Sequence, residues 1–310
     1  MDQSYNSLRR PMVSILVTLL TVFIGFQVVG PFIGSLIAFP FFDGDAIAFG
    51  KAFNNPEDFS RLKIPVLIMQ GFSAIFGLIL IPIFLLRKQQ RSWNDLTVPD
   101  TWHIQPALLI PIIVIVFMGV NSVFISWNAD ANLPDAFGIE QWARTMEDKL
   151  EDLTKSITNF ENTGELILAF IVIVIIPAIG EELVFRGMIQ NDFYRATRNY
   201  HVAIWVSAFI FSAIHFQFYG FVPRLLLGAL FGYLYYWSGN LWMPILAHFV
   251  NNGFTLMAMH LHRTGTITVD LENPEAAPFE AVVICAIFSI LLLYAYKTFY
   301  AKHGRSEITD

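Results

Sequence analysis

Three short stretches of this sequence place ionisable or amide side chains inside long apolar runs. In chain order they contain Glu181, Glu182 and Arg186, then Phe211 and His215, and finally His248 and Asn252. Residues four apart share one face of a helix, so each stretch contains one pair of side chains that point in the same direction. Because a buried polar group must find a hydrogen-bond partner, we expect three helices to turn these faces toward a common polar cavity.

The two adjacent glutamates differ in the chemistry that they can support. Glu182 and Arg186 are four residues apart and can form an ion pair along one helix face. Glu181 points about 100° away from Glu182 around the helix and is left without that partner. A carboxylate held away from water becomes a usable proton acceptor. Glu181 is therefore the candidate general base.

Each of these residues also has a purely structural interpretation. A single histidine in a membrane helix can be a satisfied hydrogen bond between helices, and Asn251 or Asn252 alone is more typical of helix packing than of chemistry. Glu182 with Arg186 is most simply an ion pair that braces the site. The functional interpretation depends on the whole set, since ionisable groups inside a membrane are rare and usually functional.

The composition predicts that these side chains lie in a membrane protein. Hydrophobic residues make up 55% of the 310 residues and charged residues 14%, against about 25% charged residues in soluble domains. The net charge of -6 offers no basic surface for nucleic acid. The single Cys285 excludes a disulfide framework and any multi-cysteine metal site. A soluble enzyme, a disordered chain and a nucleic-acid-binding protein are thereby excluded.

Eight apolar runs of suitable length for a membrane span position the three motifs. They cover residues 12–39, 64–86, 104–127, 166–181, 202–218, 222–237, 241–260 and 281–300. The first run is longer than the about 7–15 residues of a signal-peptide core, so we expect it to remain as a helix. We predict an all-α fold: a single integral-membrane domain over residues 1–310, built as a polytopic transmembrane bundle of about eight helices around a membrane-embedded polar cavity.

Basic residues predict which helix ends face the cytoplasm. If the helices alternate in direction, one side of the membrane collects Arg9, Arg10, Arg87, Lys88, Arg91, Arg195, Arg198, Lys297, Lys302 and Arg305. The opposite loops are more acidic, and the longest, residues 128–164, should hold a short amphipathic helix at the outer surface. We expect both termini in the cytoplasm and the protein in a bacterial cytoplasmic membrane.

Straight helices that all cross the membrane would separate the two histidines in depth. His248 then lies near the cytoplasmic end of the seventh helix, and His215 near the opposite end of the fifth. A shared site therefore requires kinks, for which Pro177, Pro223 and Pro244 are candidates, or a cavity open to the cytoplasm.

The three polar stretches form spaced motifs. As they stand in this sequence, the motifs are Glu181-Glu182-x-x-x-Arg186, Phe211-x-x-x-His215 and His248-x-x-x-Asn252. Together they resemble the signature of the CPBP intramembrane proteases, which include the type II CAAX prenyl endopeptidases and the Abi group linked to bacteriocin self-immunity. The resemblance covers a core of residues 166–259. It implies a glutamate-dependent enzyme, classed with the metalloendopeptidases, that hydrolyses peptide bonds inside the membrane.

The resemblance also implies a role for each motif residue. Glu181, with His215, would activate the attacking water, and His248 and Asn252 would polarise the scissile carbonyl and stabilise the oxyanion. These tasks agree with the local physics, since a general base must accept a proton and an oxyanion needs fixed donors in a dry cavity. The supporting residues implied by the same resemblance are Glu182, Arg186 and Phe211.

These residues leave the participation of a metal ion open. Glu181, His215 and His248 could supply three ligands of an open zinc site, but the sequence lacks the compact His-Glu-x-x-His signature. We expect no obligatory cofactor, with zinc at those three residues as the alternative.

The expected partners are the lipid bilayer and a membrane-associated peptide or protein substrate; the sequence does not report whether that substrate is prenylated. One alternative is a non-catalytic membrane scaffold or bacteriocin self-immunity factor that keeps the protease fold. Another is a proton- or ion-coupled transporter, because carboxylates and histidines at depth also suit proton relays. A transporter would favour inverted repeats, and the sequence contains no internal repeat.

Overall fold

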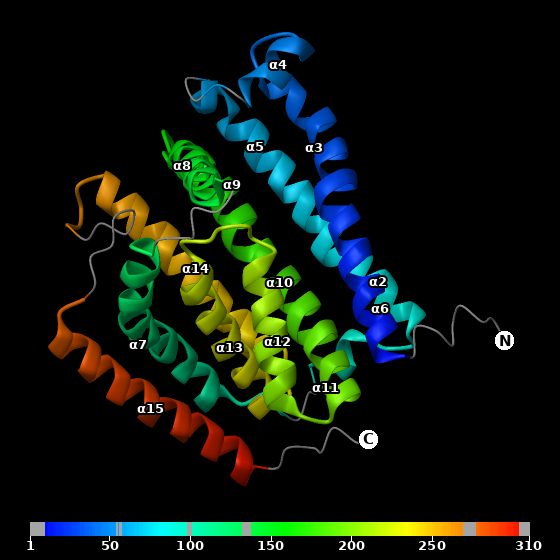
Figure 1. The fold of residues 1–310 in the computed structure, drawn as a ribbon, viewed down its shortest axis with the longest axis vertical. Helices are drawn as coiled ribbons and strands as arrows, with labels where there is room; N and C mark the ends of the chain where they lie inside the picture. Colours follow the sequence, from blue (N-terminus) through cyan, green and yellow to red (C-terminus); the bar gives the residue numbers. More distant parts are fainter. Residues whose placement is uncertain are drawn as a thin grey trace.

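The computed structural model describes residues 10–53, 55, 58–97, 101–131, 138–268 and 277–303. Within these ranges the regular structure is helical, apart from one antiparallel bridge between Thr97 and Asn240. Figure 1 shows long helical rods packed side by side. The all-α bundle predicted from the sequence is confirmed.

Five continuous helices are long and apolar enough to cross a membrane, counting the described residues alone. The first is Pro11–Phe41, made of α2 (Pro11–Ile24), a π-helical turn (Gly25–Val29) and α3 (Gly30–Ala38), and the second is Phe59–Lys88, made of α5 (Phe59–Ala74), a π-helical turn (Ile75–Leu80) and α6 (Ile81–Lys88). The third is α7 (Ile104–Ala129) and the fifth is α15 (Phe279–Lys302). The fourth is Thr163–Thr197, in which α9 (Thr163–Ala169), α10 (Ile176–Glu182) and α11 (Asn191–Thr197) are joined by π-helical segments at Phe170–Ile175 and Leu183–Gln190. Each exceeds the about 20 residues that a bilayer requires. The chain is therefore an integral membrane protein.

Three shorter helices complete the bundle: α12 (Tyr200–Ala213), α13 (Phe221–Ser238) and α14 (Trp242–Arg263). In Figure 1 they lie between the α7–α15 pair on one side and α2, α3 and α5 on the other. Together with the five long helices they match the eight predicted ones, within the part of the chain that the structure describes. Two of the three motifs lie on this inner group.

The fourth long helix extends further than the sequence predicts. Its apolar run ends at residue 181 and the sequence places Glu182 and Arg186 on the same helix, but in the structure the helix continues to Thr197. Glu182 and Arg186 pair with each other at 2.8 Å along this helix, so their charges do not end it. Every residue of Leu183–Gln190 is buried, so protein rather than lipid surrounds the polar side chains of this segment.

Unequal helix lengths bring two of the motifs to one level. At 1.5 Å per residue, Glu181 lies about 24 Å from the Thr197 end of its helix. The next helix, α12, starts beside that end at Tyr200 and has only 14 residues. His215, just beyond it, therefore lies about 22 Å from the start of α12. Because α12 ends inside the bundle, its histidine stays beside Glu181.

The start of α14 lies well inside the bundle and brings the third motif to the same level. Leu241, just before the helix, packs against Gly187 and donates its N–H to the Leu96 carbonyl at 2.8 Å. Gly187 lies about 9 Å from Glu181 along one helix, and His248 lies about 10 Å from Leu241 along the other. The two helices run in opposite directions, so His248 returns to the level of Glu181. The straight, fully spanning helices assumed from the sequence do not apply here.

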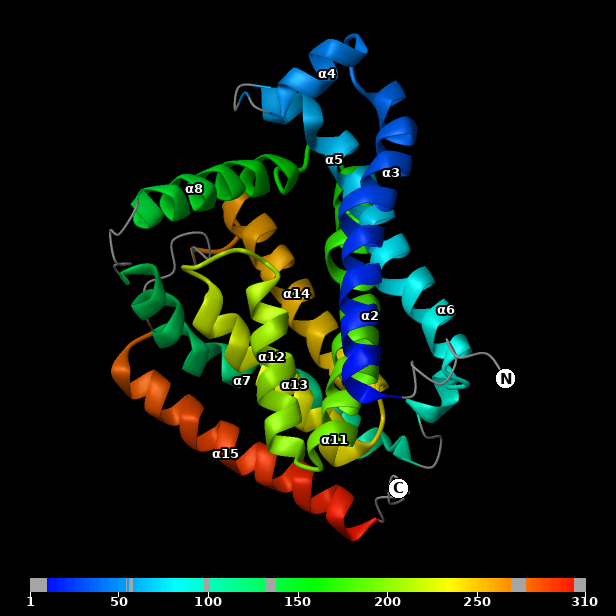
Figure 2. The same cartoon turned by 45° about the vertical axis from the view of Figure 1, so that its right-hand side comes forward.

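Two smaller helices lie outside the long ones. α4 (Ala46–Ala52) follows α3, and α8 (Ile139–Ile157) confirms the amphipathic helix predicted within residues 128–164. Figure 2 shows α8 lying across one end of the bundle, above α12 and α14. That this end faces outward stays a prediction.

The opposite end of the bundle gathers the helix ends that carry the basic residues. Asp192 on α11 accepts a hydrogen bond from Ser14 Oγ at 2.5 Å and pairs with Arg91 Nη1 at 3.5 Å, so α2, α6 and α11 meet there. His103 before α7 contacts His303 after α15, with ring centroids 5.7 Å apart. The basic residues that lie outside the described part of the chain are Arg9 and Arg305. A cytoplasmic location for this end stays a prediction.

Glycines allow the first two long helices to approach closely. A methyl group built on Gly30 would lie 2.3 Å from Ser73 Cα, and one on Gly77 would lie 2.6 Å from Phe26 Cβ. Membrane helices associate through such small residues, because the hydrophobic effect does not drive helices together within lipid.

We predict that Gly30→Ala destabilises the protein, since the added methyl group forces the backbones of α3 and α5 apart. The expected loss is about 1–3 kcal/mol, seen as a lower unfolding temperature in detergent. Gly50→Ala is the matched control, because Gly50 on α4 has open space around it. Equal unfolding temperatures for Gly30→Ala and the control would contradict the close contact.

Candidate active site

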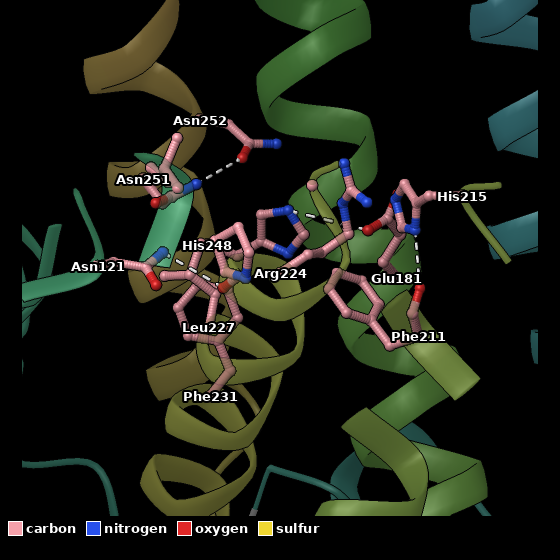
Figure 3. A pocket seen from close by; sticks show the side chains of 13 residues that line it. Asn121, Glu181, Phe211, His215, Arg224, Leu227, Phe231, His248, Asn251 and Asn252 are labelled. Carbon is pink, nitrogen blue, oxygen red and sulfur yellow. Dashed lines mark hydrogen bonds and ion pairs between the residues drawn. The ribbon is translucent and has the colours of Figure 1, made fainter. Parts of the chain in front are cut away.

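A cavity of about 290 Å³ collects all three motifs. Its walls come from α7, α10, α13 and α14 and from the end of α12. Five of the seven predicted site residues line it directly: Glu181, Phe211, His215, His248 and Asn252. In Figure 3, Glu181 lies between His215 and His248. The shared polar cavity expected from the sequence is therefore present.

A buried ion pair supports one wall of this cavity. Glu182 and Arg186 are 0% and 1% exposed, and Arg186 Nη1 donates to Glu182 Oε1 at 2.8 Å. Arg186 Nη2 donates to the Gly228 carbonyl of α13 at 2.8 Å. The same Oε1 of Glu182 accepts a hydrogen bond from His248 Nδ1 at 2.8 Å. One carboxylate thus joins α10, α13 and α14.

Two phenylalanines enclose the guanidinium of this pair. The Arg186 Cζ atom lies 4.9 Å from the ring centroid of Phe211 and 5.4 Å from that of Phe231. Cations are attracted to aromatic faces, and more strongly where water is excluded. This contact gives Phe211, an apolar member of its motif, a physical role beside the charged residues.

His248 is oriented toward Glu181. Because its Nδ1–H donates to Glu182, its Nε2 points the other way and lies 3.9 Å from Glu181 Oε2. The ring stacks on Phe231 with centroids 5.4 Å apart. Glu181 itself faces the cavity, and its side chain is 16% exposed. Hence the second glutamate fixes the imidazole, and the first remains open to the cavity.

His215 is held by the carbonyl of its own motif partner. Its Nδ1–H donates to the Phe211 carbonyl oxygen at 2.7 Å. That oxygen is available because the backbone N–H of His215 bonds to Ser212 instead, as α12 ends. Phe216 then adopts a left-handed backbone conformation (φ 54°) and leads the chain away. The arrangement leaves His215 Nε2 free to act in the cavity.

Asn252 connects α14 to the fourth helix. Its Nδ2 donates to the Ile173 carbonyl at 3.1 Å, and its Oδ1 accepts from Asn251 Nδ2 at 3.1 Å. Pro177, four residues after Ile173, has no N–H to complete the usual helical bond to that carbonyl. Asn252 therefore compensates for a proline while lining the cavity.

Two further cavity residues lie outside the motifs. Arg224, near the start of α13, lines the cavity and donates to Gln217 Oε1 at 2.6 Å. Asn121 of α7 also lines it and donates to the Pro223 carbonyl at 3.3 Å. The sequence does not predict that these two side chains point into the cavity, because this depends on where α13 starts relative to its neighbours. For Asn121, the one signal in the sequence is that a polar residue stands within a predicted apolar span.

A second cavity of about 510 Å³ shares three of the motif residues. Glu181, His215 and Asn252 form part of its wall. Its other walls come mainly from α3, α5 and the fourth helix and are largely apolar; examples are Phe26 and Met69. Glu181 therefore stands where a polar and an apolar cavity meet.

The predicted metal ligands do not form a metal-binding group. Within the described residues, no three histidine, cysteine, aspartate or glutamate side chains come together in a way that could hold an ion. We therefore derive no step through a metal at Glu181, His215 and His248.

Residues 163–254 match the family described as type II CAAX prenyl endopeptidase Rce1-like. Similar curated proteins include the uncharacterized protein YpbD of Bacillus subtilis, 32% identical over 84 residues (26% of this chain, 40% of YpbD). The membrane-embedded CAAX protease MroQ of Staphylococcus aureus is 32% identical over 116 residues (36% and 42%), and the putative membrane peptidase YdiL of Bacillus subtilis is 32% identical over 90 residues (29% and 36%). The matches thus span about two fifths of these relatives, and no solved structure matches the chain. The resemblance inferred from the motifs is confirmed.

We predict that replacing the two glutamates changes stability by different amounts. Glu182→Ala leaves Arg186 buried without its carboxylate, which should lower the free energy of unfolding by about 3–5 kcal/mol. Glu181→Ala removes a side chain whose nearest ionic partner is 3.9 Å away, so the change should stay below about 1 kcal/mol. Thermal unfolding of the purified variants in detergent measures both values. Similar losses for the two variants would show that Glu181 is also a structural residue.

Proposed function

We propose that this chain, whose residues 163–254 match the Rce1-like type II CAAX prenyl endopeptidases, is an intramembrane endopeptidase. The supporting observation is the 3.9 Å between Glu181 Oε2 and His248 Nε2, both directed into one cavity. That separation is too long for a direct hydrogen bond and suits one water molecule that contacts both atoms. The cleaved bond belongs to a membrane-associated peptide or protein.

Glu181 is the general base in this proposal. It accepts a proton from water as the water oxygen attacks the carbonyl carbon of the scissile bond. His215, with Nδ1 held by a carbonyl, offers its Nε2 as a second acceptor for that water. As the C–N bond breaks, the proton passes from Glu181 to the leaving nitrogen. The products are a carboxylic acid and a neutral amine, and Glu181 is again a carboxylate.

His248 and Asn252 stabilise the oxyanion. With both ring nitrogens protonated, His248 donates from Nε2 while Nδ1 stays on Glu182. Asn252 has one amide hydrogen on Ile173 and a second one available. Fixed donors in a cavity with little water are an effective way to stabilise a developing negative charge.

We predict that Glu181→Gln lowers cleavage by about 10²- to 10⁴-fold, since the amide keeps the shape of the side chain but cannot accept the proton. Glu280→Gln, an exposed change at the start of α15, is the matched control and should leave cleavage intact. The measurement compares membrane proteomes of cells that carry each form and looks for a cut peptide end that disappears. Unchanged cleavage in Glu181→Gln would contradict the proposed base, and the absence of any cut end that depends on the native protein would favour a non-catalytic scaffold or self-immunity factor that keeps the fold.

We predict that cleavage survives removal of divalent metals, because the proposed base and donors are side chains of the chain itself. Purified protein is treated with a strong zinc chelator, dialysed and assayed on a substrate that the proteome comparison identifies. A matched sample with zinc restored should show the same rate. Loss of cleavage on chelation, with recovery on adding zinc, would instead support the zinc alternative at Glu181, His215 and His248.

A further inference from the structure

The cavity floor is closed toward the basic end of the bundle. Below Glu181, every residue from Glu182 to Gln190 is buried. Arg186 and Gln190 of this segment both donate to carbonyls of α13, Gly228 at 2.8 Å and Gly232 at 3.1 Å. At the end of the same helix, Asp192 is fully buried and bound to α2 and α6. A polypeptide cannot reach Glu181 through this packed region.

Both cavities extend from Glu181 in the opposite direction. The first cavity includes Gly220 and Arg224, at the end of α13 that lies under α8, and Ile125 near the end of α7. The second cavity includes Phe53, which follows α4, and Leu153 on α8 itself. The open space around Glu181 therefore leads to the end of the bundle that α4 and α8 cover.

α8 covers this opening through contacts with the turn between α12 and α13. Trp142 packs edge-on against Phe218 with ring centroids 5.8 Å apart, and the Arg144 guanidinium lies 4.6 Å from the Tyr219 ring. Burial raises the pKa of Glu147, while the charge of Arg224 and the Tyr219 backbone N–H oppose that rise. In Figure 2, α8 lies directly above this turn. These contacts join surface side chains, and so they can part without exposing the core.

The cavity wall contains two polar atoms without hydrogen-bond partners, and a peptide backbone has the groups to pair with them. Arg224 Nη1 and Asn121 Oδ1 are both buried and have no hydrogen-bond partner in the described structure. One is a donor and the other an acceptor, as are the C=O and N–H of an extended chain. Leaving such atoms unpaired is costly, so a bound peptide that pairs with both is favoured.

We propose that substrates reach Glu181 from beneath α8, so that the cleaved bond lies in a polypeptide segment on the extracytoplasmic side of the membrane. The side is given by the charge distribution: the closed end carries the clustered Arg and Lys residues, which face the cytoplasm in membrane proteins. The substrate class is thus an extended peptide segment that has been translocated or that emerges from the outer leaflet. This deepens the proposed function and rests on it.

The direction of access can be tested without any activity. In a Cys285→Ser background, single cysteines are placed at Ile125 in the cavity, Lys149 on α8 and Lys88 at the end of α6. A charged maleimide that does not cross membranes is added to spheroplasts or to inside-out vesicles. We expect Ile125→Cys and Lys149→Cys to react in spheroplasts and Lys88→Cys to react in inside-out vesicles. Reaction of Ile125→Cys from the Lys88 side, its protection in both preparations, or Lys149→Cys reacting in inside-out vesicles would each overturn the proposal.

A second arm tests the route during cleavage. Trp142→Cys with Phe218→Cys, in the same background, is joined by a bis-maleimide, which fixes α8 over the opening. Each single variant treated with a monofunctional maleimide is the control. We expect the cross-linked form to cleave at least about tenfold more slowly than the controls; full cleavage after complete cross-linking would overturn the route. If Glu181→Gln retains cleavage, the proposed function fails while the labelling result still stands.

Discussion

The site depends on one carboxylate buried among three helices. Glu182 accepts hydrogen bonds from Arg186 and His248 through the same oxygen, and Arg186 extends the connection to the backbone of α13. Removing both charges from water is expensive, and their attraction compensates only if the geometry is good and the other donors are satisfied. Such a pair is weak evidence for stability, but it defines where α10, α13 and α14 must meet. It also fixes the ring of His248, and with it the distance to Glu181.

The geometry around this carboxylate follows from helix ends that stop inside the bundle. α12 ends after 14 residues, and Leu241, just before α14, packs against Gly187 of the fourth helix. The backbone groups freed at those ends are not left unpaired: the Phe211 carbonyl binds the His215 ring, and the Leu241 N–H binds Leu96. In a low-dielectric environment such groups must be satisfied within the protein. The hydrogen bonds that satisfy the backbone groups at the ends of these short helices therefore also hold site residues in place.

The sequence predicts the existence of the bundle and the membership of the site, because apolar runs and i,i+4 spacing are local properties. The pairing of Glu182 with Arg186 follows directly from that spacing. Depth is different, since it depends on where each helix starts relative to its neighbours. Straight helices therefore place His215 and His248 at different depths, whereas the start of α14 beside Gly187 brings both histidines to the wall of one cavity. The side of the membrane that each end of the bundle faces is predicted from the distribution of basic residues alone.

The π-helical segments of the fourth helix have a consequence for how this region tolerates changes in chain length. A π-turn holds about one residue more than an α-turn, and so it is the place where a single residue has been accommodated without breaking the helix. Deleting one residue from Leu183–Gln190 would let the segment rewind as ordinary α-helix, and the residues beyond it would keep their direction relative to Glu181, because the wide turn had absorbed the extra residue. Asp192 would then still face Ser14 and Arg91. This segment is therefore expected to tolerate the loss of one residue better than the α-helical segments beside it.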